Sequence, residues 1–128
     1  MKLNWFSPLP PAKTGIADYT LRLLPALCRH ADVVLWTDRP SWSSEIEQYA
    51  DVRYYQLDNL PWADIHQGDL NIYHIGNNCD FHSGIWQVSR QCPGCAILHD
   101  VKLHHLFGGM YLQQWRDKNA YLERMTRY

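Results

Sequence analysis

The chain contains short stretches whose residue types could do chemistry, and the first is the loop after its opening apolar run. The segment Ser7–Asp18 reads "SPLPPAKTGIAD", with Gly15 at the start of an amphipathic pattern. A glycine lets the main chain approach a ligand, and the free N–H groups of a helix start favour an anion such as phosphate. The alternative is a purely structural helix start, in which Thr14 caps the helix and Asp18 complements its dipole.

The second stretch, "HIGNN", ends in two amides, Asn77 and Asn78. Amide side chains can donate to and accept from the hydroxyls of a sugar. Asparagines after a glycine are more typical of a tight turn, so the residues alone favour the turn interpretation, with sugar contacts as the alternative.

The third stretch, "ILHDVKLHHL", places His99 and Asp100 directly after an apolar run. An imidazole at the end of a buried strand could bind a ligand or move a proton, although a single histidine is more often structural. Asp100 is also a candidate N-cap of the next helix. His104 and His105 are adjacent, so we expect them to point to different sides of that helix.

Several established motifs do not match. The sequence contains neither G-x-x-x-x-G-K-[ST] nor G-x-G-x-x-G, and no serine or cysteine lies in a nucleophile-elbow context. The stretch "CPGC", Cys92 to Cys95, has the spacing of zinc knuckles and of redox sites. It precedes an expected strand instead of opening a helix, so we interpret it as free thiols in a turn, with a zinc or redox protein as the alternative.

The elements that must position these residues alternate between strands and helices. Apolar runs predict strands at 2–6, 32–38, 52–57, 69–76 and 95–100, and helical patterns lie at 16–27, 41–50, 81–91, 103–115 and from 118 onward. Pro25 should bend the first helix or end it early, Gly108 and Gly109 weaken the helix over 103–115, and residues 57–68 read as a connecting loop. The alternation predicts an α/β, Rossmann-like fold, a mostly parallel sheet with helices on both faces and ligands at the carboxyl ends of its strands.

Composition limits the classes of function. The 128 residues suit one domain, and a net charge of −1 gives no general attraction to nucleic acid or to anionic membranes. The first residues lack the apolar core of a signal peptide, so we expect a cytoplasmic protein. The helical stripe of "KNAYLERMTRY" has no cap or strand after it, which predicts that the chain is a fragment of a longer protein.

The stretches "NWFSPLPPAKTGIADYT", "YHIGNN" and "ILHDVKLHHL" together resemble the N-terminal domain of retaining glycosyltransferases of family 4, which have the GT-B fold. The resemblance covers nearly the whole chain in order and spacing, and Thr14 replaces the serine of the family's "SGIADY"-like loop. It implies that residues 1–128 form the acceptor-side domain of a two-domain enzyme. The donor-binding C-terminal domain, with its pair of glutamates, is absent from this sequence.

The resemblance also implies roles for particular residues. Gly15, together with Thr14, would approach the diphosphate of a nucleotide-sugar. His99 would be the active-site histidine near the transferred sugar. Contacts to the sugar or the acceptor would come from Asn77, Asn78 and Asp100.

The reaction implied is hexosyl transfer with retention, from a nucleotide-sugar to a glycan or lipid acceptor, as in polysaccharide biosynthesis. Retention in this family is ascribed to front-face attack, so neither an enzyme nucleophile nor a metal cofactor is expected. We expect the fragment alone to be inactive, and its location to be the cytoplasm or the inner face of the membrane. A non-catalytic Rossmann-like module that binds a nucleotide or a sugar is the alternative.

Overall fold

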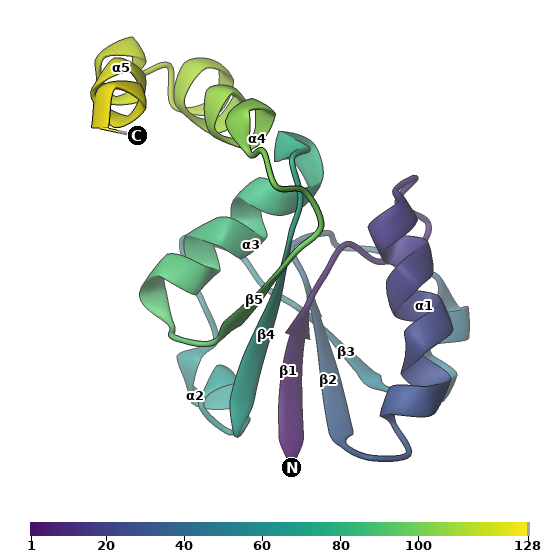
Figure 1. Ribbon diagram of the computed structural model, residues 1–128. Helices are drawn as coiled ribbons and strands as arrows, with labels where there is room; N and C mark the ends of the chain where they lie inside the picture. The colour runs from purple at the N-terminus through teal and green to yellow at the C-terminus, as the bar shows by residue number, and fades with distance from the viewer. Residues whose placement is uncertain (128) are drawn as a thin grey trace.

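The computed structural model describes residues 1–127, and its centre is a parallel β-sheet (Figure 1). The five strands of this part of the chain are β1 (Lys2–Phe6), β2 (Asp32–Thr37), β3 (Asp51–Tyr54), β4 (Leu70–Ile75) and β5 (Cys95–Leu98). They lie in the order β3-β2-β1-β4-β5, and every neighbouring pair is parallel. The predicted α/β, Rossmann-like fold is confirmed.

Helices connect the strands and cover both faces of the sheet (Figure 1). They are α1 (Gly15–Leu27), the 3₁₀ helix η1 (Ser44–Gln48), α2 (Trp62–Ile65), α3 (Cys79–Gln91), α4 (His104–Gly108), the π-helix η2 (Gly109–Gln114) and α5 (Lys118–Arg127). One core lies under α1 and η1, and the other lies under α2, α3, α4 and η2. Side chains alternate between the two cores along each strand, so Trp5 packs under α1 and Phe6 under α3.

The chain order creates a switch point between β1 and β4. From β1 the chain moves outward to β2 and β3, and it then returns to place β4 on the other side of β1. In parallel sheets of this kind, ligands bind beyond the carboxyl ends of the strands at such a point. The loop after β1 and the segments after β4 and β5 lie at this edge.

A buried polar residue explains an element that the sequence analysis missed. Residues 57–68 were expected to be a loop, but they contain α2. Asn4, fully buried in β1, donates from its amide to the carbonyl of Ile65 at the end of α2, over 2.6 Å, and accepts from the indole N–H of Trp36, over 2.9 Å. These bonds satisfy a buried amide in the middle of the sheet, which would otherwise be costly.

Other boundaries also differ from expectation. β3 ends at Tyr54 instead of residue 57, because Gln56 and Asn59 form an isolated antiparallel bridge in a turn. α1 does not end at Pro25 but continues to Leu27, and Pro25 itself is exposed. The predicted helix over 103–115 changes from α to π geometry at Gly109. This is one of the two glycines that were expected to weaken the helix.

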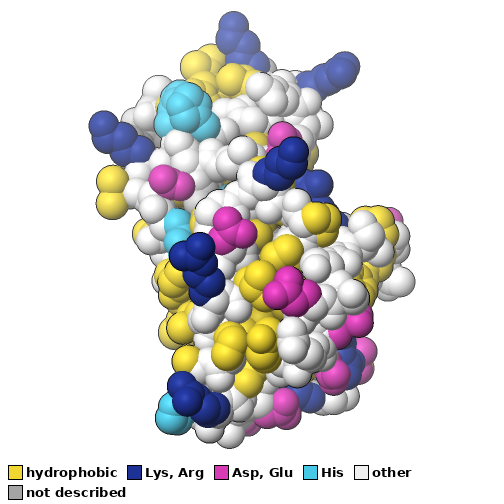
Figure 2. Space-filling view, turned by 90° about the vertical axis from the view of Figure 1, so that its right-hand side faces the viewer, with side chains coloured by type: hydrophobic (Ala, Val, Ile, Leu, Met, Phe, Trp, Pro, Cys, Tyr) yellow, Lys and Arg dark blue, Asp and Glu magenta, His cyan; other side chains and the backbone are white. Residues whose placement is uncertain are grey.

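The surface carries charges of both signs. Figure 2 shows acidic and basic side chains interspersed with apolar ones over the face that carries α1. Among residues 1–127, no helix combines the length and the apolar character needed to cross a membrane.

Candidate functional site

The start of α1 is open to solvent at the carboxyl edge of the sheet. The hydroxyl of Thr14 accepts the N–H of Ile16 at 3.3 Å, which is the cap expected of a helix start. Gly15 is exposed, and a Cβ atom added to it would meet no atom within 4 Å. The loop residues 10–15 and Asp18 line a hollow of about 420 Å³ beside this glycine.

The structure leaves one first-turn N–H free for a ligand. Ile16 donates to the side chain of its cap, and Ala17 donates to the carbonyl of Thr14 at 3.1 Å. The N–H of Gly15 has no such partner among the described residues. The cap by Thr14 therefore agrees with the structural interpretation of the helix start. The unpaired N–H of Gly15 beside it is available to a ligand.

His99 follows β5 and is half-buried at the same edge. Its main-chain N–H donates to the carbonyl of Ile75 at 2.9 Å, which extends the pairing of β5 with β4 by one residue. Burial lowers the pKa of its imidazole, and the adjacent Asp100 carboxylate acts in the opposite direction. His99 is thus held by its main chain while part of its ring remains accessible.

Two further histidines lie behind His99. His74, in β4, is completely buried, and its Nδ1 atom lies 2.8 Å from Nε2 of His99. His82, in α3, places its Nδ1 atom 2.9 Å from the main-chain oxygen of His74, so this nitrogen carries a hydrogen and donates it. Burial, together with the nearby His99 and His82, lowers the pKa of His74 to about 3. His74 is therefore uncharged at neutral pH.

Tyr19 joins the helix start to the histidines. It lies four residues after Gly15 in α1, and the two residues line the same shallow hollow of about 520 Å³. Its ring centroid lies 5.4 Å from that of His99 and 6.0 Å from that of His74. The side chain of Tyr19 is 41% exposed. The glycine and the histidine thus share one neighbour at one edge.

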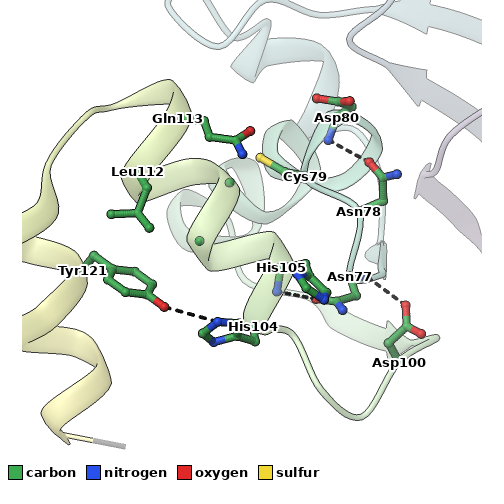
Figure 3. Close-up of a pocket in the computed structure, with 12 residues that line it drawn as sticks. Asn77, Asn78, Cys79, Asp80, Asp100, His104, His105, Leu112, Gln113 and Tyr121 are labelled. Atoms are coloured by element: carbon green, nitrogen blue, oxygen red, sulfur yellow. Dashed lines mark hydrogen bonds between the residues drawn. The ribbon is translucent and has the colours of Figure 1, made fainter.

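The asparagines lie in a separate hollow of about 680 Å³ between α3, α4 and η2 (Figure 3). Asn77, Asn78 and Asp100 all line it, and so do both His104 and His105. His104 also lines a second hollow that does not include His105. The hollow is rich in amide, carboxylate and imidazole groups, which suit the hydroxyls of a sugar.

The side chains of both asparagines also make structural hydrogen bonds, as the turn interpretation requires. The side-chain oxygen of Asn78 caps α3 by accepting the N–H of Asp80 at 2.9 Å. The side-chain oxygen of Asn77 accepts the N–H groups of His105 and Leu106 at 2.9 and 3.1 Å, at the start of α4 (Figure 3). Both residues thus have structural bonds, whether or not a ligand also binds them.

Asp100 does not cap α4, because that helix begins four residues later, at His104. Its carboxylate instead accepts the main-chain N–H of Asn77 at 2.8 Å. This bond joins the end of β5 to the turn after β4. The predicted capping role therefore belongs to Asn77, which approaches α4 from another part of the chain.

Close packing explains why a glycine stands at position 76, in the stretch "HIGNN". A Cβ atom on Gly76 would lie 2.7 Å from Nε2 of His82 and 3.0 Å from Cδ1 of Ile16. Because α1 and α3 both approach this point from opposite faces, a side chain larger than hydrogen would displace one of them. The position is therefore explained by packing around the histidines.

The cysteines of "CPGC" lie far from a redox arrangement. Cys92 is buried at the C-terminal end of α3, and Cys95 is exposed at the start of β5. A redox motif places its reactive cysteine at a helix N-terminus, where the dipole stabilises the thiolate. Within residues 1–127, no three His, Cys, Asp or Glu side chains are grouped so that they could hold a metal ion.

The sequence analysis assigned no role to His74, although it placed the segment after β4 at the ligand edge. The available signal was a histidine in a largely apolar parallel strand, two residues after Ile72 and thus on the same face. Comparisons of the chain with known protein families, with curated proteins and with solved structures find no match. The site therefore has to be interpreted from its own geometry and from its sequence motifs.

Proposed function

We propose that the chain is the acceptor-side domain of a retaining glycosyltransferase that uses a nucleotide-sugar donor. The observation that carries this proposal is the contact series at the carboxyl edge: Gly15 with a free N–H, then Tyr19, then the accessible ring of His99. A phosphate site and a sugar-contacting imidazole have to be neighbours in such an enzyme. The resemblance of the motifs to family 4 glycosyltransferases is the second support.

The leaving group explains the need for the helix start. Cleavage of a nucleotide-sugar builds negative charge on the departing diphosphate and positive charge on the anomeric carbon. The N–H of Gly15, aligned with the positive end of the 13-residue helix α1, would stabilise that negative charge most strongly in the transition state. Removal of one such donor in a preorganised site typically lowers turnover about 100- to 1,000-fold.

His99 would contact the transferred sugar or orient the attacking hydroxyl. Its lowered pKa keeps the ring neutral near pH 7, so it can donate one hydrogen bond and accept another. The hollow lined by Asn77, Asn78 and Asp100, the residue that follows His99, would receive the acceptor.

The test separates donor binding from transfer. Both are measured on the longest natural protein that contains the chain, binding by NMR on the isotope-labelled protein with UDP-glucose and GDP-mannose as probes. We expect a donor to shift the amide signal of Gly15. Gly15→Val should abolish this shift and transfer, while the folded spectrum is retained because the new side chain meets open space.

The matched control is Gly108→Val, since a Cβ atom at Gly108 also meets nothing within 4 Å. It adds the same bulk away from α1, in the hollow assigned to the acceptor, so donor binding should be retained and this control is compared by donor binding alone. Transfer near the unaltered rate in Gly15→Val would overturn the phosphate role. Donor binding by the natural protein without any transfer would favour the non-catalytic module instead.

A further inference from the structure

We propose that His74 is a positioning residue that fixes the tautomer of His99, so that His99 presents its Nδ1–H to a sugar oxygen. The assignment of this N–H to a sugar rests on the proposed function. The tautomer itself is a property of this chain and can be measured without any reaction.

The hydrogen bond between the two rings contains one proton. Nδ1 of His74 and Nε2 of His99 are 2.8 Å apart, and the ring centroids are 5.1 Å apart with an interplanar angle of 30°. A neutral imidazole carries one N–H and one lone pair, so one ring donates and the other accepts. Which ring donates decides which nitrogen of His99 carries its hydrogen.

The other nitrogen of His74 selects between the two arrangements. Nε2 of His74 is buried and has no partner among the described residues. If it carried the hydrogen, the structure would contain an orphaned N–H donor, and such donors are rarer in native proteins than under-satisfied acceptors. We therefore assign the lone pair to Nε2 of His74 and the hydrogen to its Nδ1.

This assignment determines which nitrogen of His99 carries a hydrogen. Nδ1–H of His74 donates to Nε2 of His99, so the neutral ring of His99 must carry its hydrogen on Nδ1. This is the minority tautomer of a free histidine side chain, and His74 therefore supplies the reason for it. Nδ1 of His99 makes no hydrogen bond within residues 1–127 and is free to donate to a ligand oxygen.

The surroundings of His74 prevent it from turning. The ring of Trp5 lies 4.4 Å from it, centroid to centroid, and the indole N–H of Trp5 is itself bound to Thr20 at 3.3 Å. On the opposite side of the strand, His82 holds the carbonyl of His74. A fixed donor on a buried strand is the arrangement that orients a functional side chain precisely enough to act.

The experiment measures the tautomer of His99 by long-range proton–nitrogen NMR on the isotope-labelled chain near pH 7.5. We expect Nδ1–H in the unaltered protein. His74→Phe keeps the aromatic bulk but removes the donor, and His99 should revert to the Nε2–H form. His74→Asn places an amide N–H at the δ position, where Nδ1 of His74 lies, and should restore Nδ1–H. Finding Nε2–H in the unaltered protein overturns the proposal even if no variant folds.

The matched control is Ile72→Ala, which loosens the same strand and face without touching the hydrogen bond. It should destabilise the fold and leave the tautomer unchanged, whereas a general packing effect would change the tautomer here as well. An unchanged tautomer in a folded His74→Phe variant also contradicts the proposal.

Kinetics then separate this inference from the proposed function. In the natural protein, His74→Phe should lower kcat about 10- to 100-fold, the usual cost of losing an outer orienting partner, with donor affinity retained and with recovery in His74→Asn. If the tautomer is as assigned but the protein transfers no sugar, the proposed function fails and the positioning of His99 stands. If transfer occurs and kcat of His74→Phe is unaltered, the catalytic consequence of positioning fails.

Discussion

Acid should destabilise this fold through a histidine that makes no contact with solvent. His74 is completely buried, and burial lowers the pKa of its imidazole from 6.5 to about 3. The unfolded chain therefore takes up a proton below about pH 6.5 that the folded chain refuses. Because the unfolded state binds more protons in this range, the free energy of unfolding decreases as the pH falls.

The size of the effect follows from the two pKa values. With 6.5 in the unfolded chain and about 3 in the folded chain, acidification from about pH 7.5 to about pH 5 removes about 2 kcal/mol of stability through His74 alone. The folded value hardly enters this figure, since the folded imidazole is still neutral at about pH 5. Burial also lowers the pKa of His82 and of His99, so both act in the same direction.

The assay is urea unfolding, followed by tryptophan fluorescence at a series of pH values. His74→Gln cannot be protonated, so its free energy of unfolding should fall by about 2 kcal/mol less than that of the unaltered protein over the same interval. An acid loss in His74→Gln equal to that of the unaltered protein would refute the reasoning, because the proton would then have been taken up elsewhere.

Two further predictions concern the edge of the sheet. His99→Ala should lower the turnover of sugar transfer more than the affinity for donor, because the ring is proposed to act on the transferred sugar; equal losses in steady-state kinetics would make His99 a binding residue only. Asn77→Ala removes the acceptor for two N–H groups at the start of α4 and should cost about 1 kcal/mol in urea unfolding, with hydrogen exchange accelerated in α4, whereas Asn77→Asp keeps the acceptor and should stay near the unaltered stability.

Most helices and strands could be predicted because they depend on residues close together in the sequence, such as helix caps and apolar runs. The helix after the first loop begins at Gly15 and has Thr14 as its cap, as its sequence indicates. Apolar β-branched runs predicted all five strands to within a few residues. By contrast, α2 has only four residues, too few for a helical period, and its place depends on Asn4, which lies 61 residues earlier than its partner Ile65.

The candidate site was less predictable because its contacts join remote residues. The strand-end positions of Gly15 and His99 could be inferred, since parallel strands bring their carboxyl ends to one edge. The bond from His74 to His99 spans 25 residues, and the cap that Asn77 gives to α4 spans 28 and 29. Such pairings depend on how strands and helices pack, so a sequence pattern suggested Asp100 as the cap where the structure uses an asparagine from the neighbouring turn.

The two hollows at this edge of the sheet offer different chemical groups, and this difference bears on the proposed role of His74 and His99. The hollow at Gly15 offers a main-chain N–H and the positive end of a helix, whereas the hollow at Asn77 offers amide, carboxylate and imidazole groups. The first set of groups suits a phosphate and the second suits hydroxyls. Tyr19 lies against His99, and a ring in the proposed role is most useful if it presents the same nitrogen with the same proton. Because burial keeps His74 neutral, its Nδ1 can hold that arrangement in our proposal for as long as His99 is neutral as well.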